Sequence, residues 1–481
     1  MIALLLFVGD ALARAGGGQG YGGGGSSGGG SSGGGGSYGG GGGGDGLGLL
    51  LWLIFNYPCI GVPVVIVVII LVVAQKRNAS GGQRTVYRAH PEAAPVRGAD
   101  ASFLLPFDAN FSLPLFLDLA RLVFVRAHEE RGRKNWDALR PFVTPEAIRA
   151  LEQRGAVREV REVVIGSAGL AGAALRGETA VLDVVFHANY TEVTDTARQW
   201  YVVERWTYQR AAATPSPGPD RMRALACPSC GNPSETRADG SCTRCDVVIT
   251  DGRLQWHVSS VTLAERSPLA RIALEPGVGV EAGTRAPTLT APDLAAQMRR
   301  FASRHPEFAW AAFRARTEDS FRRVQTAWSA RDAGALRPLE SDFLYQQHRY
   351  WLERYAREGL HNRVEKVEVT EVVPVKLTLD AWLEAFTVRI YASVRDWTED
   401  RDGKVVGGSR DRSRQFSEYW TFIRSTGATS KAADLDHCPS CGAPLDRVSE
   451  TGVCGYCEAK VTGGEFDWVL ATIDQDEAYI G

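Results

Sequence analysis

Eight of the nine cysteines fall into two groups with nearly identical spacing. The groups are Cys227, Cys230, Cys242 and Cys245, and Cys438, Cys441, Cys454 and Cys457. Each group holds two Cys-x-x-Cys pairs separated by eleven or twelve residues, which allows four thiolates to meet at the corners of a tetrahedron. Each group therefore predicts one structural zinc ion, with disulfides or an iron–sulfur cluster as the alternatives. Four cysteine ligands leave no open position for a substrate.

The residues around these cysteines support a structural reading. Gly231 and Gly442 directly follow the second cysteine of each group, where such turns commonly need a positive φ. His257 and His437 lie near the groups but are surplus to a site of four cysteines. Each group stands between the last two predicted strands of its region, so we expect a zinc ribbon in a hairpin loop and no redox role.

The first hundred residues cannot form a globular core. Ile2–Val8 is a short apolar run followed by small residues up to Ala15, which resembles a secretory signal; an uncleaved apolar tail is the alternative. Residues 16–46 are nearly all Gly and Ser and predict a flexible tether. Leu49–Val73 has no charge and is long enough to span a bilayer, although Pro58 and Pro63 interrupt it. A re-entrant hairpin that bends between residues 56 and 63 is the alternative.

The charges beside this apolar segment predict its orientation. Residues 16–49 contain no Lys or Arg, whereas Lys76, Arg77, Arg84 and Arg88 follow the segment. Positive flanks favour the cytoplasm, so we expect a single-pass protein of a bacterial cytoplasmic membrane with its C-terminal domains inside. A reducing compartment would keep the clustered thiols free to bind metal. The net charge is −2 and no basic block occurs, which excludes nucleic acid as a predicted partner.

The remainder of the chain is an internal duplication. Trp136–Phe142 is repeated as Ala333–Leu339, and a strand ending in Trp-Thr-aromatic occurs at residues 206–208 and 420–422. A cysteine group follows each strand, and a short strand with Trp256 or Trp468 closes each copy.

The second copy shows the expected elements most clearly. Phe313, Thr317, Phe321, Val324 and Trp328 lie on one helical face. Residues 343–355 predict a second helix that ends before Gly359, and residues 386–394 alternate with the period of a strand. Each copy thus predicts an α+β domain in which helices cover one face of a curved antiparallel sheet. The predicted organisation is a signal at 1–15, a tether at 16–46, a transmembrane helix at 47–75, a linker at 76–105, a first domain at 106–268 with a ribbon at 225–248, a linker at 269–296, and a second domain at 297–478 with a ribbon at 436–460.

Catalytic motifs are absent from the sequence. Asp183 and His187 share one face of a predicted strand and, with Tyr190, could line a pocket, but core or surface positions in a sheet are the simpler explanation. Because no nucleophile elbow, phosphate loop or paired carboxylates occur, we expect no catalytic residues.

Three segments of the second copy resemble a known family. Phe321–Trp328, Asp332–Leu339 and Phe416–Arg424 resemble the domain shared with subunit 44 of the mitochondrial inner-membrane import translocase. The resemblance covers residues 308–424 well and the first copy more weakly, and the ribbons look like insertions. It implies a fold similar to nuclear transport factor 2, with helices and a bent sheet enclosing an apolar pocket. It also implies a scaffold at the membrane that contacts lipid or translocation partners.

Two functions follow from these observations. The first is a membrane-tethered scaffold, possessing two modules that engage protein segments or lipid in a transport process. The alternative is an enzyme, isomerase-like or hydrolase-like, that uses the pocket through Asp183 and His187.

Overall fold

The computed structural model describes Ala15 and residues 99–269, 279–281, 283–428, 435–476, 478–479 and 481. The predicted signal, tether, span and first linker therefore lie outside the described residues, apart from Ala15 and the end of the linker. Within the described part of the chain, no helix is long and apolar enough to cross a membrane. Residues from Val96 onward belong to one compact unit.

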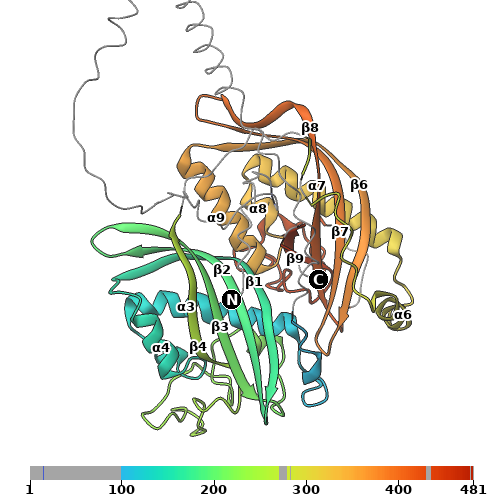
Figure 1. Ribbon diagram of the computed structural model, residues 1–481. Helices are drawn as coiled ribbons and strands as arrows, with labels where there is room; N and C mark the ends of the chain where they lie inside the picture. The colour runs from blue at the N-terminus through green and yellow to red at the C-terminus, as the bar shows by residue number, and fades with distance from the viewer. Residues whose placement is uncertain are drawn as a thin grey trace, which may run out of the picture. The chain divides into compact units, whose positions relative to one another are not determined.

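Two sets of elements follow one another along the chain, and we call them the first module (residues 102–268) and the second module (residues 294–475) (Figure 1). The elements of the first module are η1 (Ser102–Leu104), α3 (Leu113–Arg133), η2 (Asp137–Leu139), α4 (Pro145–Glu152), β1 (Glu159–Arg176), β2 (Thr179–Val193), β3 (Ala197–Ala211), α5 (Pro219–Met222) and β4 (His257–Pro268). Those of the second module are α6 (Leu294–Arg304), α7 (Trp310–Ala330), α8 (Ala333–Leu336), α9 (Asp342–Glu358), β6 (His361–Leu379), β7 (Leu383–Glu399), β8 (Val405–Ser425), η3 (Leu445–Arg447) and β9 (Val469–Gln475).

Each module has an antiparallel sheet with its strands in chain order. The first sheet runs β1-β2-β3-β4, and the second runs β6-β7-β8 with β9 paired to β8. Bulges interrupt β1 near Glu162 and β6 near Lys366, and these two residues adopt positive φ values of 54° and 50°. A bulge bends its strand and increases the local twist. The α+β prediction, with helices on a curled sheet, is therefore confirmed (Figure 1).

The long helix of each module ends in the same way. Lys134 and Arg331 cap α3 and α7 in the left-handed conformation, with φ values of 55° and 58°. The predicted second helix of the second module is α9, and Gly359 caps it with a φ of 73°, as its sequence position indicated.

Both modules bury equivalent aromatic side chains between the long helix and the sheet. The rings of Phe116 and Tyr208 lie 5.3 Å apart in the first module, and those of Phe313 and Phe422 lie 5.6 Å apart in the second. Phe124 and Trp206 lie 5.1 Å apart, as do Phe321 and Trp420. These contacts form the centre of two separate apolar clusters, one for each module.

Helix α6 and strand β5 were not predicted from the sequence, and neither were the short helices η1, α5 and η3. Helix α6 precedes α7, and its Phe301 is fully buried against Trp468 and Phe308. The short strand β5 (Gly279–Val280) lies in the predicted linker and pairs with β8 in parallel. The described part of that linker therefore contributes to the second sheet.

Candidate metal centres

The two cysteine groups each gather four sulfur atoms in one place. In each group all four Sγ atoms lie within 4.8 Å of one another. The Sγ atoms of Cys227 and Cys245 are 3.9 Å apart, and those of Cys438 and Cys457 are 3.8 Å apart. A tetrahedral zinc ion with zinc–sulfur bonds of about 2.3 Å requires sulfur atoms about 3.8 Å apart. All eight cysteines are free, so the described geometry fits a metal and no disulfide joins them.

Matching turns bring the sulfur atoms together. The amide of Gly231 donates to the carbonyl of Cys227 at 2.9 Å, and the amide of Gly442 donates to the carbonyl of Cys438 at 2.8 Å. The two glycines have φ values of 78° and 75°, which confirms the expectation of positive φ at these positions. A side chain at either glycine would strain the turn that aims the first two thiolates.

Nearby amides favour the thiolate form that binds metal. The side chain of Asn232 donates to Cys230 Sγ at 3.4 Å, and the backbone amide of Arg244 donates to Cys242 Sγ at 3.4 Å. Hydrogen bonds from Asn232 lower the pKa of Cys230 to about 6. The four sulfur atoms would fill the coordination shell of one ion, which suits a structural site.

The two ribbons are attached to their modules differently. In the second module Arg337 is almost fully buried, and it donates to the carbonyls of Glu340 and Glu450, each at 2.9 Å, and to Asp342 and Thr462. These bonds join the second ribbon to the start of α9. The position equivalent to Arg337 in the first module is Arg140, which is half exposed and pairs with Asp137 at 3.1 Å.

The sequence-predicted candidate pair for catalysis does not come together. Asp183 accepts a hydrogen bond from Thr207 at 2.7 Å, and His187 bonds Tyr201 at 2.8 Å. Both alternate along β2 with the buried core residues Val184 and Phe186, so they lie on the opposite face of the strand from the core. Tyr190 is on the inner face and is not part of a site with them.

A different polar cluster lies inside the first module and was missed from the sequence. His128 on α3 and Glu204 on β3 are both fully buried, with Nε2 and Oε1 3.2 Å apart. Glu204 also pairs with Arg154 and accepts a hydrogen bond from Trp206 Nε1 at 2.8 Å. The ring of His128 lies 4.8 Å from that of Tyr190. We call His128, Arg131, Tyr190, Glu192 and Glu204 the His128 cluster.

Burial and charge set the ionisation of this cluster. Burial lowers the pKa of His128, and the neighbouring Arg131 and Arg154 add to the effect, whereas Glu204 opposes it. Burial alone would keep Glu204 protonated, but its electrostatic interactions with His128 and Arg154 hold the pKa of this carboxyl below its usual range. Burial raises the pKa of Tyr190 to about 12. The cluster therefore combines a neutral histidine, an ionised glutamate and a protonated tyrosine at neutral pH.

One signal for this cluster was present in the sequence. Glu204-x-Trp206 recurs as Glu418-x-Trp420, and in the second module Trp420 Nε1 donates to Glu418 at 3.0 Å. Residues two apart on a strand share one face, so each pair could have been predicted to point inward with its tryptophan. His128 lacks such a pattern, because its partner lies on a distant strand.

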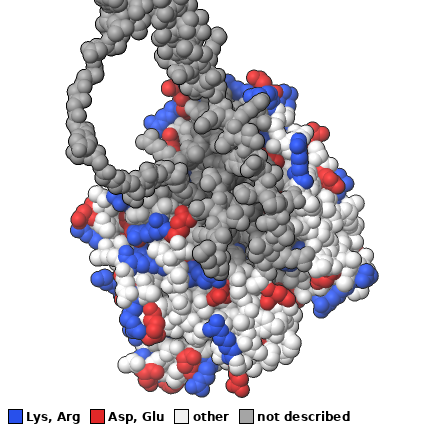
Figure 2. Space-filling model, viewed as in Figure 1, with Lys and Arg blue, Asp and Glu red and all other residues white. Residues whose placement is uncertain are grey.

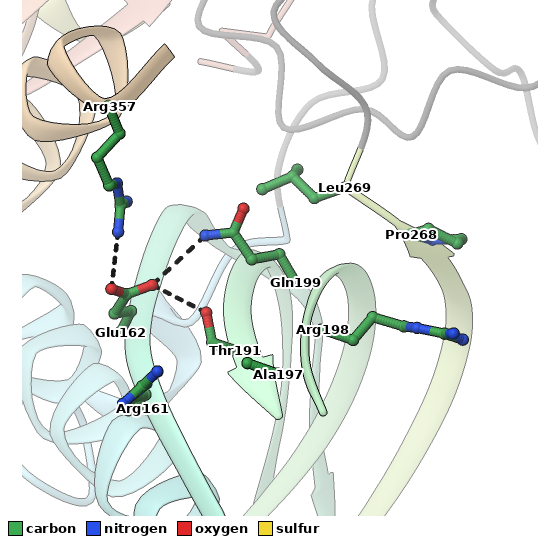
Figure 3. A pocket seen from close by; sticks show the side chains of 9 residues that line it. All are labelled: Arg161, Glu162, Thr191, Ala197, Arg198, Gln199, Pro268, Leu269 and Arg357. Carbon is green, nitrogen blue, oxygen red and sulfur yellow. Dashed lines mark hydrogen bonds and ion pairs between the residues drawn. The ribbon is translucent and has the colours of Figure 1, made fainter. Parts of the chain in front are cut away.

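A surface depression in the described residues lies where β1, β2 and β3 approach α9 (Figure 3). Glu162 is one of the residues that line it; its carboxylate accepts a hydrogen bond from Thr191 at 2.8 Å and pairs with Arg357 at 2.8 Å. Arg161 and Arg198 line its sides. This depression is open and charged, and thus differs from the enclosed apolar pocket that the family resemblance implies.

Charges of both signs are interspersed on the face of the molecule in Figure 2, outside the part that is covered by residues not described. Neighbouring opposite charges pair along helices, as between Arg314 and Glu318 at 2.9 Å. The described surface on this face therefore offers no broad field of one sign.

Fold and site together define an α+β protein with two four-cysteine groups that could hold metal ions, consistent with zinc. Residues 294–433, from the start of α6 to beyond the end of β8, match the model of the Tim44-like domain. The match covers under a third of the chain and includes all three segments on which the sequence resemblance rests. No curated protein matches the chain.

Proposed function

We propose that this chain is a membrane-tethered scaffold of a bacterial cytoplasmic membrane, with its two modules in the cytoplasm engaging protein segments or lipid in a transport process. The observation that carries the proposal is the Tim44-like domain at residues 294–433, which suggests a membrane-associated, protein-binding role. The uncharged segment at residues 49–73 and the basic residues after it support the tether and its orientation.

We propose further that the first module is a second, diverged copy of the same domain, with a fold similar to nuclear transport factor 2. The order of helices and strands, the bulge in the first strand and the paired aromatic contacts support this. Both modules close in the same way, since Thr144 donates its amide to Val258 at 2.9 Å and Ser341 donates its amide to Leu470 at 2.8 Å.

We also assign one structural zinc ion to each cysteine group. Sulfur separations of 3.8 to 4.0 Å and amide donors to the sulfur atoms support the assignment. In this role the metal stabilises the ribbon and takes no part in chemistry.

Site-specific photo-crosslinking of the full chain in membranes tests the scaffold proposal. Leu113 and Trp310 are equivalent positions at the starts of α3 and α7, each partly buried against its own apolar cluster. A photoreactive residue at Trp310 should give a discrete protein or lipid adduct, and the same residue at exposed Asp411 should not. Recovery of the chain in the soluble fraction, or the absence of any adduct at both Trp310 and Leu113, would contradict the proposal.

A further inference from the structure

The His128 cluster contains buried hydrogen-bond donors that have no partner among the described residues. Arg131 is 2 % exposed and pairs with Glu192 through Nη2, but its Nε and Nη1 are unpartnered. Tyr190 is 1 % exposed and its hydroxyl is unpartnered. Neither ring nitrogen of His128 makes a hydrogen bond of good geometry. Leaving buried donors unsatisfied costs about 1 to 3 kcal/mol each, so a native structure normally supplies an acceptor.

The unpartnered groups of His128 and Arg131 lie close to the ring of Tyr190. The ring of Tyr190 lies 4.8 Å from the ring of His128 and 5.4 Å from Cζ of Arg131. His128 and Arg131 are close on α3, and Tyr190 faces them from β2. The unpartnered groups therefore belong to one place between the helix and the sheet. A neutral His128 that turns Nε2–H toward Glu204 keeps an acceptor at Nδ1, so the unpartnered donors are those of Arg131 and Tyr190.

The positive and negative charges in and beside the His128 cluster do not balance. Glu192 pairs with Arg131 and Arg266, and Glu204 pairs with Arg154. Three guanidinium groups thus face two carboxylates, which leaves one positive charge when His128 is neutral. Water reaches Arg266, whose side chain is 25 % exposed, but Arg131 is buried, and one bound negative charge beside Arg131 would compensate the excess. A dianion such as phosphate carries two negative charges and would leave the site with a net negative charge.

The second module lacks this arrangement at the equivalent positions. Gln325 stands in place of His128, and Trp328 stands in place of Arg131. Glu204 is paired with Phe186 in the first sheet and Glu418 with Ile390 in the second, so Val394 occupies the position of Tyr190. The excess of buried donors is therefore a property of the first module and not of the shared architecture.

We propose that the His128 cluster is a binding site for a small carboxylate monoanion. The two free nitrogens of Arg131 and the hydroxyl of Tyr190 donate to the carboxylate oxygens, and the negative charge balances the excess guanidinium. This site is distinct from the metal centres and independent of the scaffold proposal. It gives the first module a small-molecule ligand that the second module does not bind.

Thermal unfolding and isothermal titration calorimetry of the full chain with sodium acetate test the site, with sodium chloride at equal ionic strength as the reference. Acetate should raise the unfolding midpoint of the wild-type chain above the value in chloride, because a ligand that binds only the folded state stabilises it. Tyr190→Phe removes one donor and should weaken acetate binding about tenfold, since hydrogen bonds to charged groups are strong.

Tyr208→Phe is the matched control. Tyr208 is also buried, but its hydroxyl donates to the carbonyl of Ala120 at 3.2 Å. This variant should lose stability without acetate and keep the acetate-dependent increase. Tyr190→Phe should instead fold as well as the wild type without acetate, because its hydroxyl has no protein partner to lose. Arg131→Lys, which keeps the charge but not the free nitrogens, should also weaken acetate binding.

Two results would overturn the proposal. The first is an equal effect of acetate and chloride on the wild-type chain, which would indicate that ordered water alone satisfies the donors. The second is unchanged acetate affinity in both Tyr190→Phe and Arg131→Lys.

Discussion

The two modules share an aromatic framework and differ in the polar groups that surround it. In both, an arginine on the third strand lies over the tryptophan that precedes the last strand, Arg210 over Trp256 at 4.5 Å and Arg424 over Trp468 at 4.6 Å. Yet His128 in the first module faces Glu204, whereas Gln325 in the second donates to the carbonyl of Ala15 at 3.1 Å. Large rings fix the spacing between helix and sheet because close packing tolerates little change in volume. Polar positions beside them can change as long as each buried charge keeps a partner.

The ribbons differ in a similar way. Both have the same turns and sulfur geometry, but only the second has a buried arginine, Arg337, that ties it to the body of its module. Lys460 of the second ribbon also donates to Asp342 on α9 at 2.5 Å, whereas its counterpart Val248 is exposed. The two ribbons therefore share their local geometry but differ in how firmly they are attached to their modules.

The largest expected effect comes from removing a buried cysteine of each ribbon. Cys242→Ser and Cys454→Ser should each reduce the metal content of the full chain from two zinc ions to one, measured by elemental analysis. Loss of a structural zinc removes most of the energy that folds its ribbon, so each ribbon should become sensitive to protease. Because the second ribbon is tied to α9, Cys454→Ser should also lower the unfolding temperature of its module more than Cys242→Ser does.

Cys59→Ser is the control for metal content, since Cys59 lies outside both groups. A wild-type chain with one zinc ion or none, while all its thiols are free, would contradict the assignment of a metal to each group.

Arg337→Gln and Arg140→Gln measure the difference in ribbon attachment. Arg337→Gln leaves buried carbonyls without a donor and should cost about 3 kcal/mol in the free energy of unfolding of the second module. Arg140→Gln removes an exposed ion pair and should cost less than about 0.5 kcal/mol. Denaturant titration compares the two variants, and equal costs would show that Arg337 does not anchor the ribbon.

His128 of the first module predicts a pH effect that Gln325, at the equivalent position of the second module, cannot produce. Burial lowers the pKa of His128 in the folded chain, so below about pH 6.5 the unfolded chain takes up a proton that the folded chain does not. The free energy of unfolding should therefore fall as the pH falls from 7 to 5.5. His128→Gln, which copies Gln325, should reduce this dependence in denaturant titrations at the two pH values.

His437→Gln, at an exposed histidine of the second ribbon, should leave the dependence as it is in the wild-type chain. An identical pH dependence in the wild-type chain and His128→Gln would show that His128 is protonated equally in the folded and unfolded states.

The smallest difference between the two modules concerns the helix caps that both modules share. Thr144 accepts a hydrogen bond from the amide of Ala147 at 3.3 Å, and Ser341 accepts one from Leu344 at 3.4 Å. Each substitution to alanine should cost about 1 kcal/mol. Ser341→Ala should cost slightly more, because the hydroxyl of Ser341 also donates to Ala471 at 3.2 Å. Thermal unfolding of both variants measures which substitution costs more stability. A larger cost for Thr144→Ala would show that the hydrogen bond from Ser341 to Ala471 does not contribute.

Local patterns in the sequence were enough to predict much of this fold. The helical face from Phe313 to Trp328 and the end of α9 at Gly359 depend on neighbouring residues, and both are found in the structure. The strand predicted at residues 386–394 is part of β7, but its burial alternates only from Ile390 onward because Thr387 and Arg389 are buried as well. Helix α6 was missed although Leu294, Met298 and Phe301 follow one another at steps of four and three and pack in the apolar cluster of the second module, because the preceding Pro/Ala linker was extended to residue 296. The parallel pairing of β5 with β8 was missed because two residues are too few to show a strand pattern.

By itself the sequence determined the two four-cysteine groups that could hold metal ions, the α+β class and the repetition of elements. These features depend on short spacings: a Cys-x-x-Cys turn, a period of 3.6 or a period of two fixes local geometry wherever it occurs. Only the tertiary structure decided which polar residues meet inside each module. His128, Tyr190 and Glu204 come from three separate elements, and Asp183 and His187 share a strand yet face away from the core. The packing of helix against sheet determines which of these side chains are in contact, and no local spacing in the sequence predicts those contacts.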